Sequence, residues 1–139
     1  MLIKGKHAKI FDVKKYRIIL PTDSKDLPEE HEISAARILA NHFKSDVEFI
    51  SRTSNKTPDI KIGNLRMEIK SPTGKGKRNI QHTLQYAIKQ SSVVVFDARR
   101  SKIHIARIRR ELARQFKMTK ILKKLILIEK DGKVVDFEK

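Results

Sequence analysis

The residues from Val93 to Asp97 form the run Val-Val-Val-Phe-Asp, which is apolar until its last position. A strand without apolar and polar alternation is typical of one covered on both faces, as in a parallel sheet. Helices are predicted on either side, over residues 79–90 and 101–116, because apolar residues recur there at helical spacing. These apolar positions are Ile80, Leu84, Ala87, Ile88, Ile105, Ile108, Leu112 and Phe116. A buried strand between two helices predicts an α/β core.

The residues before this strand predict one more helix and a group of short strands. The helix is expected from Pro28 to Phe43, because Pro suits a first helical position and the glutamates that follow suit the positive end of the helix dipole. Gly63 and Asn64 form a tight-turn dipeptide, so the strands on either side of them should make a hairpin. The expected strands are residues 47–51, 59–62 and 65–71.

Both ends of the chain predict further hairpins. Near the N-terminus, residues 7–11 and 16–20 have the composition of two paired strands. Near the C-terminus, Asp131 and Gly132 predict a type I′ hairpin turn. At 139 residues the chain has the usual length of one domain. We therefore expect a single α/β domain over residues 1–139, with a mixed central sheet flanked by helices, an N-terminal hairpin, and a C-terminal helix plus hairpin.

The charge of the chain narrows the classes of partner. Its 32 Lys and Arg stand against 16 Asp and Glu, and the formal net charge of +16 requires a polyanion or an acidic partner. Nucleic acid is the leading candidate, since the basic residues are spread along the chain instead of forming one membrane-binding helix. No apolar stretch could span a bilayer and the N-terminus lacks the apolar region of a signal peptide, so we expect a soluble protein. The absence of cysteine excludes disulfides.

Asp59, Glu68 and Lys70 lie close together in this basic sequence. On the predicted hairpin Asp59 and Glu68 should face each other, and Lys70 shares a strand face with Glu68. Two facing carboxylates repel each other unless a cation or a proton lies between them. A divalent cation would activate a water, and the Lys70 ammonium would stabilise charge on a phosphate. Glu32, in the apolar stripe of its helix, would add a ligand or a base, so the set predicts phosphodiester hydrolysis.

The same residues allow a simpler interpretation. Glu68 and Lys70 would then be alternate surface residues of a half-exposed strand, and Asp59 would only begin a strand. The order of the predicted elements favours the catalytic interpretation. A helix with an inward Glu is followed by a strand, the Asp strand, the Glu-x-Lys strand, a helix and an apolar strand, and chance would have to reproduce this whole order.

This order, with Glu32, Asp59, Glu68 and Lys70, resembles the PD-(D/E)XK nuclease superfamily over residues 29–97. More narrowly, the stretches HEISAARILANHF, PDIKIGNLRMEIKSP and IQHTLQYAIKQSSVVVFD look like the C-terminal nuclease domains of contact-dependent growth inhibition proteins of the CdiA type and related polymorphic bacterial toxins. The resemblance implies an αβββαβ core.

The resemblance also implies a function: a metal-dependent nuclease that cleaves tRNA in a bacterial cytoplasm and is neutralised by a cognate immunity protein, expected here to be acidic. Asp59 and Glu68 would bind the divalent cation, which is Mg²⁺ or, as alternatives, Mn²⁺ or Zn²⁺. The implied site residues are Glu32, Asp59, Glu68 and Lys70, with Gln81 and Gln90 as weaker candidates. Because the sequence begins at Met1 without an export module, we expect either a domain excised from a larger secreted toxin or a protein that acts where it is made.

Several other residues are candidates for weaker roles. His82 is predicted on the exposed side of its helix, where a solvated surface residue is the simpler explanation. Asp97 ends the buried strand, where site residues of open α/β sheets emerge, although a capping or turn role explains it equally well. Two Tyr and no Trp argue against a stacking platform for single strands. The residues expected to contact phosphates are Lys75, Lys77, Arg78, Arg99 and Arg100.

The sequence therefore supports two classes of function. The first is a metal-dependent nuclease, with RNA as the expected substrate and DNA as the alternative, because the chemistry at a phosphodiester is the same for both. The second is a non-catalytic basic module that binds nucleic acid, in which Glu68 and Lys70 form an ordinary salt bridge.

Overall fold

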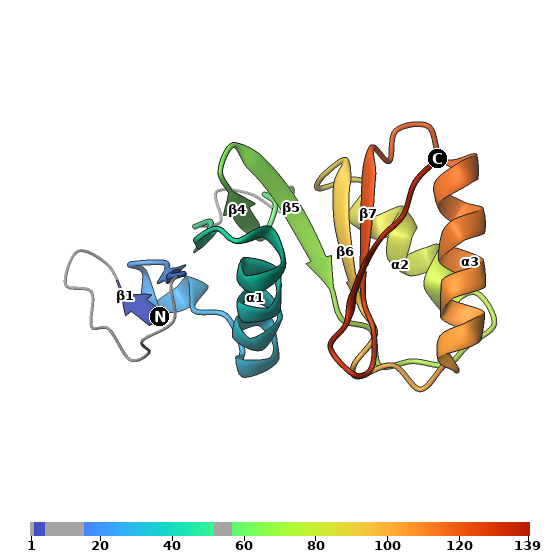
Figure 1. Cartoon of the computed structure of the whole chain (residues 1–139), viewed down its shortest axis with the longest axis horizontal. Helices are drawn as coiled ribbons and strands as arrows, with labels where there is room; N and C mark the ends of the chain where they lie inside the picture. The colour runs from blue at the N-terminus through green and yellow to red at the C-terminus, as the bar shows by residue number, and fades with distance from the viewer. Residues whose placement is uncertain (1, 5–15, 52–56) are drawn as a thin grey trace. The chain divides into compact units, whose positions relative to one another are not determined.

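The computed structural model describes residues 2–4, 16–51 and 57–139. By their internal contacts the residues form two compact units, Met1–Met67 and Glu68–Lys139. Figure 1 labels α1 and β4 in the first unit and α2, α3, β6 and β7 in the second. Both units combine helices with strands, so the predicted mixed α/β class is confirmed, while a single domain over the whole chain stays a prediction.

The first unit contains a mixed sheet. Its strands are β1 (Leu2–Lys4), β2 (Ile18–Leu20), β3 (Val47–Phe49), β4 (Ile60–Ile62) and the first half of β5 (Leu65–Lys70). The first three strands are parallel neighbours, β4 runs antiparallel to β3, and β5 begins antiparallel to β4. The predicted second arm of the N-terminal hairpin corresponds to β2, but β2 pairs in parallel with β1 and β3. The predicted first arm, residues 7–11, lies outside the described residues.

The helix of the first unit is α1 (Glu30–Phe43), which packs against β2 and β3. It begins two residues after Pro28 because Glu29 is the N-cap and forms a capping box with Glu32. It ends at Phe43, and the C-cap residue Lys44 takes the left-handed conformation with φ 53°. The buried residues of α1 are Ala35, Ala36, Leu39 and Ala40. Helical spacing predicts a buried stripe of Glu32, Ala36, Leu39 and Phe43, which is confirmed at Ala36 and Leu39, whereas Glu32 and Phe43 are half-buried.

The turn between β4 and β5 follows the prediction from Gly63 and Asn64. Gly63 has φ +60°, which glycine adopts without steric cost, whereas Asn64 stays out of the left-handed region. A positive φ at the first central residue alone is the pattern of a type II′ turn, whose twist suits a hairpin. The pairs Ile60 with Met67 and Ile62 with Leu65 confirm the predicted hairpin register.

The second unit is a βαβαββ arrangement. It begins with the second half of β5, which is parallel to β6 (Val93–Asp97), and β6 is parallel to β7 (Lys124–Ile128). The strand β8 (Val134–Asp136) returns antiparallel to β7. The connections between the parallel strands contain α2 (Asn79–Ala87) and α3 (Ile105–Met118). In Figure 1 both helices lie on the same side of β6 and β7.

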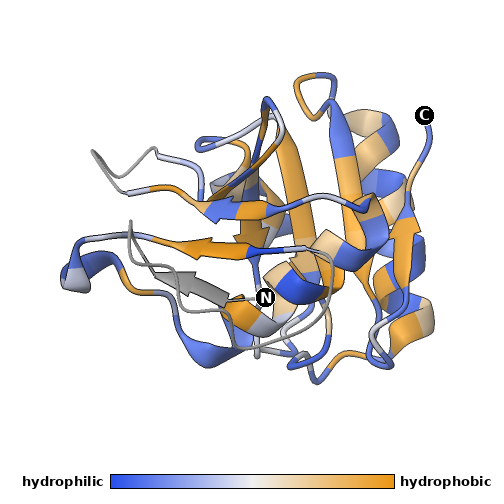
Figure 2. Ribbon diagram, turned by 60° about the vertical axis from the view of Figure 1, so that its left-hand side comes forward, coloured by the Kyte–Doolittle hydropathy of each residue, from blue (hydrophilic) through white to orange (hydrophobic). Residues whose placement is uncertain are grey.

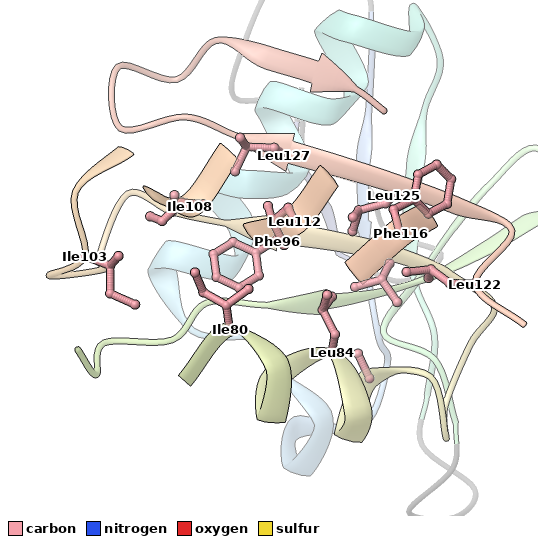
Figure 3. Packing of buried hydrophobic residues seen from close by; sticks show 13 residues of the cluster. Ile80, Leu84, Phe96, Ile103, Ile108, Leu112, Phe116, Leu122, Leu125 and Leu127 are labelled. Carbon is pink, nitrogen blue, oxygen red and sulfur yellow. The ribbon is translucent and has the colours of Figure 1, made fainter. Parts of the chain in front are cut away.

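The core of the second unit lies between this face of the sheet and the two helices. Figure 3 shows Ile80 and Leu84 of α2 directed toward Phe96 of β6. From α3, Ile108, Leu112 and Phe116 complete the cluster, together with leucines of β7. Every residue of β6 is buried, as the unbroken apolar run predicted. Figure 2 shows the corresponding alternation of hydrophobic and hydrophilic bands on the helices.

Both helices of the second unit are shorter than predicted. The third helix was expected from Ser101 but α3 starts at Ile105, because the Ser101 hydroxyl accepts a hydrogen bond of 3.1 Å from the Ile103 amide and holds a turn there. The N-cap is His104, whose Nδ1 accepts from the Ala106 amide at 3.1 Å. The second helix ends at Ala87 and continues to Gln90 only as a hydrogen-bonded turn.

The C-terminal hairpin of β7 and β8 is confirmed, but the predicted turn type is wrong. A type I′ turn needs positive φ at both central residues, and here Gly132 has φ 89° while Asp131 stays out of that region. The Gly132 amide bonds the Glu129 carbonyl at 2.9 Å, and the Lys133 amide bonds the Asp131 carboxylate at 3.0 Å. The glycine therefore follows a tight turn, as in hairpins with a glycine bulge. In the described part of the chain, no helix has the length and apolar character needed to cross a membrane.

Candidate functional site

A pocket of about 120 Å³ in the first unit brings together carboxylates from three separate segments. They are Asp26, Glu32 and Asp59. Asp26 ends a short 3₁₀ helix, Ser24–Asp26, and the neighbouring Lys25 also lines the pocket. Glu32 and Asp59 were predicted to share a site, whereas Asp26 was not among the predicted residues. No local pattern singles out Asp26, because its position depends on how the segment before α1 packs.

Glu32 has a structural role as well as a candidate catalytic one. It lies in the first turn of α1, where its Oε1 accepts a hydrogen bond of 3.0 Å from the Glu29 amide. In return, the Glu29 side chain accepts from the backbone of Glu32, which completes the capping box. Glu32 is half-buried and lines the pocket. The local sequence at the helix start therefore fixes where this carboxylate lies.

Asp59 precedes β4 and is held by backbone hydrogen bonds on both sides. Its amide bonds the Met67 carbonyl at 3.1 Å, and its own carbonyl accepts from the Ile50 amide at 2.9 Å. The residue is only 7% exposed, although it lines the pocket. Its place in the wall of the pocket makes Asp59 a candidate ligand of the first unit.

The chemistry of the pocket fits a hard divalent cation. Among the residues that the structure describes, no three His, Asp or Glu side chains are grouped so that they would hold a metal ion between them. Mg²⁺ does not need such a group, because it is usually bound by one or two carboxylates and keeps several waters. The carboxylate oxygens of Asp59 and Glu32 are the hard donors that this ion prefers, and a pocket of about 120 Å³ has room for its waters.

Glu68 and Lys70 lie in the second unit, in the half of β5 that pairs with β6. The Lys70 Nζ is 3.1 Å from the Glu68 Oε2, so the two side chains share one face of the strand as predicted. The Glu68 side chain is 1% exposed and that of Lys70 is 29% exposed. The Lys70 side chain is therefore partly accessible to solvent, and its ammonium neutralises a buried carboxylate. This arrangement suits both a catalytic lysine beside a ligand and a structural ion pair.

Basic residues gather where the parallel strands of the second unit end. The loops after β5 and β6 both leave the carboxyl edge of the sheet, where open α/β sheets bind their ligands. Arg107 of α3 connects these regions, because its guanidinium donates a hydrogen bond of 2.9 Å to the Lys77 carbonyl. We call this group the basic edge, and its members are Lys75, Lys77, Arg78, Arg100 and Arg107.

Arg107 was not among the residues predicted to contact phosphates. From the sequence, the arginines of the third helix are expected on its solvent side, where with the loop after Lys70 they form a broad positive face suited to a folded RNA. Only the hydrogen bond to Lys77 associates this one arginine with the loop after β5. The helix period alone could not have separated Arg107 from Arg110 or Arg114.

Arg99, also predicted to contact phosphate, is engaged by Asp97. The Asp97 side chain is fully buried at the end of β6, and it accepts from the Arg99 backbone amide at 3.1 Å as well as from its guanidinium. The hydrogen bond to Asp97 raises the pKa of Arg99, against the opposing effect of burial. Of the two roles considered for Asp97, the turn role accounts for these bonds. A phosphate contact by Arg99 stays a prediction.

The remaining candidates lie on or just beyond α2. His82 is exposed, as predicted, and Gln81 is half-buried. Gln90 lies in the turn after α2 and is half-buried. None of the three lines the pocket of Asp26, Glu32 and Asp59. Their catalytic roles stay predictions.

The comparisons with known proteins agree on one family. The family model described as the contact-dependent growth inhibition CdiA C-terminal domain matches residues 56–134, more than half of the chain. The chain is similar to a solved structure, the CdiA-CT/CdiI toxin and immunity complex from Burkholderia pseudomallei, with a TM-score of 0.61 and 26% identity over 78% of this chain and 83% of that chain. No curated protein matches the sequence. The CdiA-type resemblance is thus confirmed, whereas the PD-(D/E)XK assignment stays a prediction. The chain belongs to the family of CdiA C-terminal domains of contact-dependent growth inhibition.

Proposed function

We propose that this toxin domain is a metal-dependent ribonuclease whose substrate is tRNA. The observation that carries the proposal is the pocket where Glu32 and Asp59 meet, two carboxylates from distant parts of the sequence. Carboxylates that line the same pocket offer oxygen ligands to a hard cation, and acidic groups in a cleft are candidates for proton transfer.

Each of the four candidate site residues has a distinct role in this proposal. Asp59 is a ligand of the divalent cation, and Glu32 accepts a proton or supplies a further oxygen. The family resemblance implies a catalytic role for Glu68 beside Lys70. Lys70 stabilises the negative charge that builds up on the phosphate during cleavage. The Lys70 side chain is partly exposed while its partner Glu68 is buried, so the lysine is the member of the pair that a substrate can reach. The cation, when bound, lowers the pKa of a water so that hydroxide forms near neutral pH.

The charge of the chain supports a folded RNA as substrate. The net charge of +16 and the basic edge together favour an extended polyanion over a small phosphorylated molecule. The loop after β5 leads directly from Lys70 into the basic edge, so binding and chemistry would be adjacent in the chain. tRNA, more than duplex DNA, is the expectation from the family resemblance.

The proposal includes an acidic immunity protein as partner. The solved structure to which this chain is similar is a complex of a toxin and an immunity protein. A protein with a net charge of +16 would attract an acidic inhibitor from a distance, which speeds association. The inhibitor would cover the basic edge and so exclude RNA. We place the action of the domain in the cytoplasm of a target bacterium.

The decisive experiment incubates the purified chain with total RNA, purified tRNA and plasmid DNA, in Mg²⁺ and in EDTA. Glu68→Gln is tested in parallel, since it keeps the shape of this buried side chain. We expect cleavage of tRNA that requires Mg²⁺ and is lost in the variant. Cleavage in EDTA at an unchanged rate would exclude the metal-dependent mechanism.

Two other outcomes would overturn the substrate or the reaction class. If plasmid DNA is cut while tRNA stays intact, the domain is a DNA endonuclease. If the chain binds nucleic acid without cutting it, the Glu68–Lys70 pair is structural and the domain is a binding module. A growth assay supplies the cellular counterpart, in which expression of the unaltered chain should slow growth more than expression of Glu68→Gln.

A further inference from the structure

A second pocket, in the second unit, borders the candidate catalytic lysine. Its volume is about 290 Å³, close to the lower end of the sizes found for small-molecule sites. The pocket lies between the end of β5 and the face of α2, and none of its lining residues belongs to the first unit. The lining residues are Lys70, Ser71, Pro72, Thr83 and Tyr86.

Tyr86 is the unusual member of this lining. This large aromatic residue is 64% exposed, on the face of α2 opposite the one that is buried in the core. It lies one turn after Thr83, so both side chains are on the pocket side of α2. The Lys89 ammonium is 5.2 Å from the centroid of the Tyr86 ring and covers one face of it. The ring is therefore oriented by a cation on one side while most of it faces solvent.

The other polar groups of the pocket suit a sugar and a phosphate. Lys70 contributes an ammonium on a partly exposed side chain, and this ammonium already lies beside the Glu68 carboxylate. The Ser71 hydroxyl is buried and makes no hydrogen bond within the described residues. Buried hydroxyls in native proteins nearly always have a partner, which an ordered water or a ligand oxygen can supply. The Thr83 hydroxyl is already engaged, because it donates to the Asn79 carbonyl at 2.8 Å.

We propose that this pocket binds one unpaired nucleotide of the RNA substrate, with its base stacked on Tyr86 and its phosphate at Lys70. The inference rests on the proposed function, since it assigns Lys70 to a phosphate of RNA, and it adds a residue that selects the substrate. An aromatic ring accepts any base by stacking, and unpaired bases of RNA are recognised in this way. Lys89 adds a positive charge near the neighbouring phosphate.

A single stacking residue agrees with the composition of the chain. With two Tyr and no Trp, the sequence argued against a platform that holds a long single strand. One tyrosine beside the catalytic lysine instead holds one displaced base, such as a base in the loop of a folded RNA. The domain would then cut at unpaired positions and leave duplex regions intact.

The first test measures stacking without cleavage. The probe is a short single-stranded RNA with one 2-aminopurine, whose fluorescence is quenched when the base stacks. In the Glu68→Gln background we expect quenching that persists in Tyr86→Phe and disappears in Tyr86→Ala. Because stacking of one base contributes about 1–3 kcal/mol, Tyr86→Ala should weaken binding by about 5- to 140-fold. Ile121→Ala is the matched control, since Ile121 is 57% exposed and lies outside this pocket.

The second test measures tRNA cleavage by the same Tyr86 and Ile121 variants with Glu68 intact. We expect kcat/KM to fall in Tyr86→Ala, to stay within about twofold of the unaltered chain in Tyr86→Phe, as one aromatic ring replaces another, and to stay unchanged in Ile121→Ala.

If Tyr86→Ala cuts tRNA at the original rate, or if the probe is not quenched by a chain that cuts tRNA, the stacking site is wrong and the ribonuclease proposal stands. If the unaltered chain neither binds nor cuts RNA, the ribonuclease proposal is wrong and the stacking site is overturned with it. If Tyr86→Ala weakens binding of an acidic inhibitor protein but leaves RNA binding and cleavage unchanged, Tyr86 contacts the inhibitor and the stacking site is wrong.

Discussion

The guanidinium group of Arg99 donates hydrogen bonds of 2.9 and 2.8 Å to the two carboxylate oxygens of Asp97, which is fully buried at the end of β6. The Arg99 backbone amide donates a third bond to the same carboxylate. A buried charge with this many donors is satisfied by its own loop and has little need of a ligand. The pair therefore fixes the turn that leads from β6 toward α3.

Asp97→Asn should destabilise the protein without a specific loss of activity. The substitution removes the charge that holds Arg99, and hydrogen bonds to charged groups contribute about 1.5–3 kcal/mol, so we expect the free energy of unfolding to fall by about 2 kcal/mol. Urea denaturation measures this loss. The tRNA cleavage rate per folded molecule should stay within about twofold, an estimate of ours for a group that only supports a turn. If the fully folded Asp97→Asn variant cleaves tRNA much more slowly than the unaltered chain, Asp97 has a catalytic role.

Glu32→Gln should separate the two roles of Glu32. A glutamine can still accept the hydrogen bond from the Glu29 amide, because Glu and Gln both complete a capping box. The free energy of unfolding should therefore change little, whereas cleavage should fall strongly if the carboxylate binds a cation or a proton. Glu32→Ala should lose activity and also about 1 kcal/mol of stability with the cap.

The matched control for Glu32 is Glu30→Gln. Glu30 lies in the same first turn of α1 but is exposed and does not line the pocket. Its substitution should leave both cleavage and stability close to those of the unaltered chain. Equal activity of the Glu32→Gln and Glu30→Gln variants would remove Glu32 from the site.

Removal of basic-edge lysines should reduce the salt dependence of RNA binding. We expect the double variant Lys75→Ala, Lys77→Ala to bind tRNA more weakly at low salt, with a less steep plot of log K against log salt. Each lost phosphate contact should lower the slope by about 0.7–0.9. The control is the pair Lys117→Ala, Lys120→Ala, exposed residues at the opposite end of α3. If both pairs change the slope equally, binding is not localised to the basic edge.

The ion pair between Glu111 and Arg114 in α3 should contribute to the free energy of unfolding only above acidic pH. The hydrogen bond from Arg114 lowers the pKa of Glu111, against the effect of burial, and Gln115 adds a second hydrogen bond. Because the folded-state pKa is lowered, the contribution is complete above the unfolded-state pKa of about 4.3 and is lost as the pH falls through the folded-state pKa.

Urea denaturation of Glu111→Gln across a pH series measures this contribution. The variant should be less stable than the unaltered chain at neutral pH, by the small amount expected of a surface pair, and the two should converge in acid. Glu138→Gln, at another exposed glutamate, serves as control. A difference between Glu111→Gln and the unaltered chain that stays constant down to acidic pH would contradict the ionic origin of the effect.

The sequence by itself determined the order of helices and strands. Apolar spacing in α1, α2 and α3 and the unbroken apolar run of β6 reflect which side of each element is buried, and this information is local. Gly63 and Gly132 similarly marked both hairpins, since each takes a positive φ that other residues adopt at a cost. The shared strand face of Glu68 and Lys70 followed from the alternation of side chains alone.

Only the tertiary structure decided which charged groups meet. Asp26 joins Glu32 and Asp59 at one pocket, Arg107 reaches the loop at Lys77, and Tyr86 borders Lys70 across the end of β5. The helix α3 also starts later than predicted. The Ser101 side chain accepts a hydrogen bond from a backbone amide before the helix, and His104 accepts one from the first turn of the helix. Periodicity specifies the face on which a side chain lies, but the distance between faces of different elements depends on loop paths and core packing. Those quantities arise from the whole folded chain, so no local pattern encodes them.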